Sequence, residues 1–233
     1  MARIDGIIFD KDGTLFDFRL SWGAWCDSLL QEFAAQGRDP QSLARAMGFD
    51  PVTRHFDRDS RVIAGTPDEI AADLLPHLPG ETLPALTQRI NRLAAAAPMV
   101  PAVDLRVVLQ GLRSRGLSLG LVTNDAEAPA RAHLAAAGIA DLFDFVAGFD
   151  SGHGAKPAPE ALLAFCRQTG LQPARVAMVG DSRHDLEAGR AAGMWRVAVL
   201  TGIAERADLA PHADVVMPDI GGLAAWIDAL APA

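Results

Sequence analysis

The sequence predicts an α/β fold, in which helices cover a parallel sheet and one helical block is inserted near the start. An apolar run precedes residue 16, and from residue 98 onward apolar runs alternate with amphipathic helices. Between them, residues 16–97 show apolar positions at helical spacing and no alternating strand pattern. Strands that alternate with helices indicate right-handed βαβ units and therefore a parallel sheet.

The composition is typical of a chain with a well-formed core and an acidic surface. Half of the 233 residues are hydrophobic, and the net charge of −8 argues against a nucleic-acid partner. No apolar run approaches the ~20 residues that a membrane span needs, and no apolar signal core is present. Cys26 and Cys166 lack metal-ligand spacing, so we expect free buried thiols. We expect a cytoplasmic protein, monomer or homodimer, without a nucleic-acid or membrane partner.

The first buried strand is predicted over Ile4 to Phe9, and it ends in two carboxylates. The sequence DKDGT follows at 10–14, so Asp10 and Asp12 lie two positions apart. Two acids this close repel each other, and burial disfavours their charged forms. A divalent cation, or a division of the pair into one acid and one base, resolves the conflict. A plain Asp-Gly turn is the alternative at this point.

The inserted block is predicted to be helical. Trp22, Trp25 and Phe33 belong to one apolar stripe with steps of three and four residues, and we expect the two tryptophans to be packing residues. A threonine cap at Thr66, followed by proline and two acids, is a helix start. Further helices are predicted over residues 42–47, 67–75 and 83–96.

From residue 98 the chain is predicted to alternate between helices and strands. Glycines at 116, 138 and 193 mark the ends of three helices. The predicted helices cover residues 103–115, 128–137, 160–169, 186–192 and 223–230. The predicted strands cover residues 117–122, 143–147, 176–179, 196–200 and 215–217.

Polar side chains follow three of the predicted strands, and a lysine lies in the loop after a fourth. Because the carboxyl ends of parallel strands meet at one edge of a sheet, we expect them to converge. Carboxylate oxygens suit Mg²⁺, and an ammonium and a hydroxyl suit the oxygens of a phosphoryl group in transfer. A carboxylate can also attack phosphorus. The residues are Asp10 and Asp12, Thr123 and Asn124, Asp181 and Asp185, and Lys156.

Four motifs in this order resemble the signature motifs of the haloacid dehalogenase-like hydrolase superfamily. They are DKDGT at 10–14, LVTN at 121–124, GHGAKPAP at 152–159 and VGDSRHD at 179–185. The resemblance implies a Rossmann-like three-layer α/β/α core, formed by residues 1–15 and 98–233, and an inserted all-helical cap domain of residues 16–97. A helical cap after the first motif is similar to the subgroup that includes the phosphoglycolate phosphatases.

The same resemblance implies catalytic roles. Asp10 is expected to be the nucleophile that forms an aspartyl-phosphate. Asp12 is expected to protonate the leaving oxygen and then to activate water. Thr123, Asn124 and Lys156 are expected to bind the substrate phosphate.

The resemblance also implies a Mg²⁺ site. Asp10, the backbone carbonyl of Asp12 and Asp181 are the expected ligands. Asp185 is expected to stand behind them, where it would orient a metal-bound water or Lys156.

These roles imply a Mg²⁺-dependent phosphatase that acts on a small phosphorylated metabolite, phosphoglycolate-like in kind. Asp12 and Asp181 argue against dehalogenase activity, and the lack of lysine in residues 16–97 argues against phosphonate cleavage. Two alternatives stay open. One is a β-phosphoglucomutase-like sugar phosphomutase, and the other is a binding or regulatory protein without catalysis.

Two further features carry weaker expectations. An arginine of the segment Arg54–Arg61 could clamp a substrate carboxylate, although such mixed charges are more often a solvated helix face. Lys11 and Lys156 are the only lysines, which makes each less ordinary as a surface residue. For Lys11 we expect the backbone N–H to contribute to the site.

Overall fold

The computed structural model describes residues 3–230 and contains a six-stranded sheet in which all neighbouring strands are parallel. The strand order is β5-β4-β1-β6-β7-β8, so β1 lies inside the sheet with β4 on one side and β6 on the other. This arrangement confirms the predicted parallel α/β fold. The strands are β1 Gly6–Phe9, β4 Ser118–Val122, β5 Phe145–Ala147, β6 Val176–Gly180, β7 Trp195–Val199 and β8 Val215–Met217.

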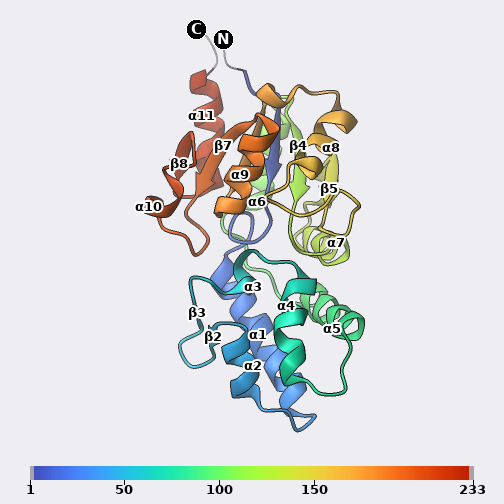
Figure 1. Ribbon diagram of the computed structural model, residues 1–233. Helices are drawn as coiled ribbons and strands as arrows, with labels where there is room; N and C mark the ends of the chain where they lie inside the picture. The colour runs from blue at the N-terminus through green and yellow to red at the C-terminus, as the bar shows by residue number, and fades with distance from the viewer. Residues whose placement is uncertain (1–2, 231–233) are drawn as a thin grey trace.

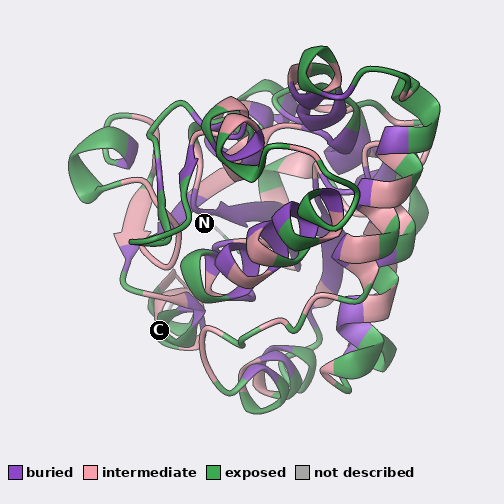
Figure 2. Ribbon diagram, turned by 90° about the horizontal axis from the view of Figure 1, so that it is seen from below, coloured by how far each residue is buried: buried purple, intermediate pink, exposed green. Residues whose placement is uncertain are grey.

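Helices cover both faces of the sheet, which gives the three layers that were expected (Figure 1). Ile7 and Phe9 pack on the side of α6, α7 and α11, whereas Ile8 packs on the side of α8 and α9. The alternation follows from the two-residue period of a strand. Figure 2 shows exposed residues on the outward sides of the helices and buried residues toward the interior, and β1 and β6 are buried along their whole length. The helices are α6 Leu105–Arg113, α7 Glu127–Ala136, α8 Glu160–Thr169, α9 Arg183–Ala192, α10 Arg206–Leu209 and α11 Leu223–Leu230.

The inserted block forms a separate lobe below the sheet in the view of Figure 1. Its buried side chains, including Trp25, Leu29 and Phe33, form a hydrophobic cluster of their own. The buried residues of this cluster run from Phe18 to Ala94, whereas Phe16 packs in the core. The cap boundaries at residues 16 and 97 stay a prediction; residues 1–2 and 231–233 of the predicted core lie outside the described residues. The helices of this lobe are α1 Phe18–Ala34, α2 Pro40–Ala46, α3 Arg61–Ala64, α4 Pro67–Leu74 and α5 Leu83–Ala95.

The cap is helical as predicted, except for one short antiparallel ladder. Strands β2 Phe49–Asp50 and β3 His55–Phe56 pair through two residues each. Asp50 accepts hydrogen bonds from Val52 N (2.9 Å) and Thr53 Oγ1 (2.7 Å), which close the turn between them. Strands this short show no alternation in the sequence, so the pattern of residues 16–97 predicted helices alone.

Two chain segments connect the lobes, and they lie side by side. Asp17 N donates to Val100 O at 2.8 Å, and Ala102 N donates to Leu15 O at 2.9 Å. The hinge therefore consists of two hydrogen-bonded segments. One segment leads into α1, and the other follows α5.

One helix begins well before its predicted start, because a capping box precedes it. Helix α9 begins at Arg183, three residues before its predicted start, because Ser182 and Asp185 satisfy each other's backbone N–H groups. This places Asp185 in the first turn of α9. Short 3₁₀ turns, which were not predicted, occur at Leu75–His77, Ala140–Leu142, Pro173–Arg175 and Ile220–Gly222. Within residues 3–230, no helix has the length and apolarity that crossing a bilayer requires.

Candidate active site

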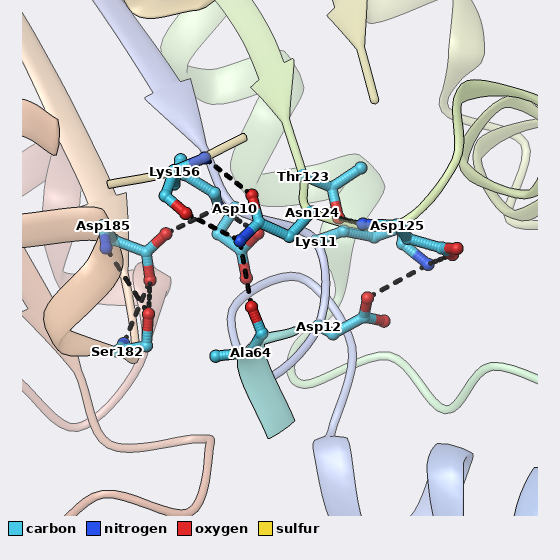
Figure 3. A network of polar contacts seen from close by, with 10 residues as sticks. All are labelled: Asp10, Lys11, Asp12, Ala64, Thr123, Asn124, Asp125, Lys156, Ser182 and Asp185. Atoms are coloured by element: carbon cyan, nitrogen blue, oxygen red, sulfur yellow. Dashed lines mark hydrogen bonds and ion pairs between the residues drawn. The ribbon is translucent and has the colours of Figure 1, made fainter. Parts of the chain in front are cut away.

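The predicted site residues meet at the carboxyl edge of the sheet, where β1 lies between β4 and β6. Asp10 follows β1, Thr123 follows β4 and Asp181 follows β6. After β1 the chain forms β4 and β5 on one side of it, and then β6, β7 and β8 on the other side. The connections on the two sides of β1 therefore lead away in opposite directions. Such a switch point opens a crevice at the strand ends. The local order of strands therefore gathers residues that are far apart in sequence (Figure 3).

Lys156 is only 5% exposed and lies among the acids at this edge of the sheet. We call Lys156 and the acids Asp10, Asp181 and Asp185 the polar cluster. Lys156 Nζ is 2.6 Å from Asp10 Oδ1 and 2.6 Å from Asp185 Oδ1. Burial alone would lower the pKa of Lys156, but the carboxylates of Asp10 and Asp185 raise it above its ordinary value. The ammonium is therefore held charged beside Asp10.

The acids of the cluster are buried close to one another. Burial raises the pKa of Asp10 to about 7; Lys156 opposes this shift, and Asp185 and Asp12 add to it. Burial, together with Asp10 and Asp185, raises the pKa of Asp181 well above its ordinary value. One ammonium is thus too little positive charge for these carboxylates.

The donor set fits a divalent cation of the Mg²⁺ type. Oxygens of Asp10, Asp181 and Asp185 all lie within 4.8 Å of one another. Asp185 is already engaged, because it accepts from Lys156 and from Ser182 N (3.0 Å) and Oγ (2.6 Å). Asp181 accepts a hydrogen bond from its own backbone N–H, and burial beside Asp10 and Asp185 disfavours its charged form. Crowded carboxylate oxygens with such an excess of negative charge are what a hard cation neutralises.

Two glycines leave room for the Asp181 carboxylate. A Cβ atom at Gly202, or at Gly13, would overlap that carboxylate. Gly13 has a φ of 76°, a conformation that favours glycine. Thr201 Oγ1 donates to Gly13 O at 2.6 Å and so fastens the two loops together. The cradle around Asp181 is therefore built from backbone.

Asn124 links the loop that contains Lys156 to the cap (Figure 3). Its Nδ2 donates to Lys156 O (3.0 Å) and to Ala64 O of α3 (2.9 Å), and its Oδ1 accepts from Lys156 N at 2.8 Å. The phosphate-binding role of Asn124 stays a prediction, because the side chain would have to release one of these carbonyls to reach a phosphate oxygen. Thr123 is 3% exposed, and its hydroxyl accepts from Asp125 N at 3.1 Å.

Lys11 contributes its side chain to the site, which the sequence analysis did not predict. Its Nζ lies 2.7 Å from Asp125 Oδ2, 3.1 Å from Asp12 Oδ2 and 3.1 Å from His133 Nδ1. The partners Asp125 and His133 are more than a hundred positions away in the chain, so local patterns could not pair them. The scarcity of lysine was the one signal that singled out this residue.

A small cavity of about 50 Å³ lies between the polar cluster and the cap. Its core wall includes Asp10, Asp12 and Lys156, and its cap wall is largely apolar. Trp22 and Trp25 belong to the core of the cap, as predicted, but they also line this cavity. Both indole Nε1 atoms are buried without a hydrogen-bond partner among the described residues.

The arginines of residues 54–61 are paired with acids, and none of them lines the small cavity. Arg54 pairs with Asp27, and Arg58 lies 3.1 Å from Glu205. Arg61 lies 2.8 Å from Asp73 and belongs with Arg58 to the wider groove at the cavity mouth. The segment covers β3, a turn and Arg61, the first residue of α3, rather than one helix face. A clamp by Arg58 or Arg61 would require the arginine to leave its acid, and this role stays a prediction.

Comparisons with known proteins agree on the family. Residues 4–193 match the model of the haloacid dehalogenase-like hydrolases. A phosphoglycolate phosphatase from Chromobacterium violaceum is 30% identical over 96% of both chains. An N-acetylmuramic acid 6-phosphate phosphatase from Pseudomonas aeruginosa is 30% identical over 92% of this chain and 91% of its own. The crystal structure of a predicted phosphoglycolate phosphatase from Haemophilus somnus has the same fold, with a TM-score of 0.75, 21% identity, and coverage of 96% of this chain and 97% of that one.

Proposed function

The chain belongs to the haloacid dehalogenase-like hydrolase family, and we propose from this premise that it is a Mg²⁺-dependent phosphatase for a small phosphate monoester. The observation that carries the proposal is the meeting of Asp10, Lys156 and Asp181 at one sheet edge. A carboxylate nucleophile beside a buried ammonium and a cation site is the arrangement that phosphoryl transfer needs.

The proposed reaction has two halves. In the first, an oxygen of Asp10 forms a bond to phosphorus while the bond from phosphorus to the alcohol oxygen breaks, and Asp12 gives its proton to that oxygen. In the second, Asp12 takes a proton from water as the water oxygen attacks phosphorus, which releases inorganic phosphate and restores Asp10. Lys156 and Thr123 hold the phosphoryl oxygens. Bound Mg²⁺ supplies positive charge that stabilises the transferring group.

We propose a substrate about the size of phosphoglycolate, which the named relative from Chromobacterium violaceum and the small cavity support. Lys156 is the one lysine or arginine among the described residues that line the cavity. The far end of the substrate therefore meets no second cation there. Trp22 and Trp25 line the cavity, and their indole N–H groups are donors without a partner among the described residues.

A panel of phosphate esters tests the proposed activity. We expect release of inorganic phosphate from p-nitrophenyl phosphate and from short alkyl phosphates with Mg²⁺, and none after chelation with EDTA. Asp10→Asn is expected to abolish turnover, because the amide is not a nucleophile toward phosphorus. Asp12→Ala is expected to lose turnover while substrate binding changes little.

Other outcomes of the panel favour the alternatives. Full hydrolysis by Asp10→Asn would contradict the proposed chemistry. Conversion of β-glucose 1-phosphate to glucose 6-phosphate would indicate a phosphomutase. Absence of turnover on every ester with Mg²⁺ would indicate a binding protein.

A matched pair of esters tests the cavity. 2-Hydroxyethyl phosphate is about the size of phosphoglycolate but carries a neutral CH2OH group in place of the carboxylate. Because no second cation lines the cavity, we expect kcat/KM for the hydroxyl compound to equal or exceed that for phosphoglycolate. A preference for phosphoglycolate of tenfold or more would show that the carboxylate is specifically recognised.

A further inference from the structure

Lys11 is a fully buried lysine with three polar partners. The side chain has no exposed surface. Its Nζ lies within hydrogen-bond distance of Asp125 Oδ2 (2.7 Å) and His133 Nδ1 (3.1 Å), and it forms an ion pair with Asp12 Oδ2 at 3.1 Å. An ammonium has three donors and no acceptor, so these three partners surround it. They leave Lys11 no spare donor for substrate, and its role must pass through a neighbour.

His133 extends the network toward the cap. Its Nε2 lies 2.7 Å from the carbonyl oxygen of Ala94, which can only accept. Nε2 therefore carries the proton, and Nδ1 is left to accept from Lys11. Ala94 lies in the last turn of α5, the cap helix that leads into the hinge. A continuous buried path of hydrogen bonds thus joins the end of the cap to Lys11.

Asp12 is the last residue of this network, and it lies at the cavity where the substrate is proposed to bind. Its Oδ2 is held by Lys11, whereas its Oδ1 is buried without a hydrogen-bond partner among the described residues. Asp12 also lines the cavity, together with Asp125 (Figure 3). One oxygen is therefore fixed from behind, and the other is left for the leaving oxygen of a substrate.

We propose that Lys11, anchored by Asp125 and His133, is a positioning residue that fixes the Asp12 carboxyl group for proton transfer to the leaving oxygen. The path through Ala94 ties this orientation to the placement of the cap. The inference rests on the proposed function, because it assigns a role to Asp12 in that reaction. Arginine could not replace Lys11, since its planar group cannot donate in the three directions that these acceptors occupy.

Two aryl esters of similar shape separate this role from a merely structural one. Phenoxide needs a proton as it leaves, whereas p-nitrophenoxide leaves well without one, so only phenyl phosphate depends strongly on Asp12. Because general acid catalysis contributes about 10²–10⁴-fold, we expect Lys11→Met to lower kcat/KM for phenyl phosphate by about 10²-fold. For p-nitrophenyl phosphate we expect a change of less than about threefold, since kcat/KM reports only the steps through aspartyl-phosphate formation.

Three further variants complete the design. His133→Phe removes the acceptor but keeps an aromatic ring, and it is expected to shift the phenyl to p-nitrophenyl ratio in the same direction; it serves if Lys11→Met does not fold. In an Asp12→Asn background, the ratio is taken from the single-turnover release of phenol and p-nitrophenol, and Lys11→Met is expected to cause no further change in it. Cys166→Ala, a buried change on the opposite sheet face, controls for lost stability and should leave the ratio unchanged.

The outcomes are distinguishable. Equal losses on both esters in Lys11→Met and His133→Phe would overturn the positioning role while leaving the phosphatase intact. Absence of Mg²⁺-dependent turnover by the unaltered chain on both esters would overturn the proposed function and this inference together.

Discussion

At the scale of single residues, the site contains more carboxylates than positively charged side chains, and its electrostatics follow from how the two lysines are shared among the acids. Lys156 bridges Asp10 and Asp185, and Lys11 bridges Asp12 and Asp125. Asp181 has neither lysine within hydrogen-bond distance. The two lysines of the chain thus divide the acids between them and leave one carboxylate for a cation, which is why we place Mg²⁺ beside Asp181.

The backbone cradle of Asp181 gives a prediction at this scale. Gly202→Ala adds a Cβ that overlaps the Asp181 carboxylate, so the carboxylate must turn away from the metal site. We expect the Mg²⁺ concentration for half-maximal activity to rise about 10–100-fold, as for other changes that disturb the orientation of a metal ligand.

Gly111→Ala is the matched control, because an added Cβ there meets only the end of the Arg115 side chain, 4.0 Å away. Its Mg²⁺ requirement should be unchanged. An unchanged requirement in Gly202→Ala as well would contradict the placement of the cation beside Asp181.

At the scale of elements, the order of strands explains why the motif residues could be predicted as one site. Each of Asp10, Thr123 and Asp181 follows a buried apolar run, and parallel strands bring such positions to one edge. The side-chain partners of Lys11 could not be predicted, because Asp125 and His133 depend on how α7 packs against the hinge. The turn that closes β2 and β3 was missed for the opposite reason, since two-residue strands carry no periodic pattern.

The link between α3 and the phosphate-site loops gives a prediction for these elements. Asn124→Ala removes the hydrogen bonds to Ala64 O, Lys156 O and Lys156 N. We expect kcat/KM for p-nitrophenyl phosphate to fall about tenfold, mainly through KM, because the cap and the Lys156 loop are held less firmly. Steady-state kinetics measure both constants.

Asn91→Ala provides the control, since Asn91 lies on α5 and its Oδ1 has no hydrogen-bond partner among the described residues. It should leave KM unchanged. A normal KM in Asn124→Ala would mean that the contact with α3 does not help to place the cap and the Lys156 loop for substrate binding.

At the scale of the whole molecule, the two lobes enclose buried carboxylates whose charge depends on pH. The folded-state pKa of Asp10 is raised from 3.8 to about 7 in the absence of a cation. A raised acid pKa contributes stability that is complete below about pH 4 and is lost as the pH rises through about 7. The folded metal-free protein therefore carries an increasing electrostatic cost toward alkaline pH.

Thermal unfolding tests this consequence. Because Mg²⁺ binds the deprotonated acids of the folded state, we expect the rise in Tm on adding Mg²⁺ to be larger at pH 8 than at pH 5.5. Asp10→Asn removes one of the titrating acids and should reduce the difference between the two pH values. An equal rise at both pH values would mean that Mg²⁺ binding is not linked to these carboxylates.

The central claim is that an oxygen of Asp10 attacks phosphorus and forms an aspartyl-phosphate. Trapping this covalent intermediate tests the claim most directly. Asp12→Asn still lets p-nitrophenoxide leave but cannot activate water, so the aspartyl-phosphate should accumulate. We expect rapid acid quenching, peptide mapping and mass spectrometry to find the phosphoryl group on Asp10, labile to hydroxylamine. Release of p-nitrophenol without a phosphoryl group on Asp10, or with the phosphoryl group on another residue, would contradict the proposed mechanism.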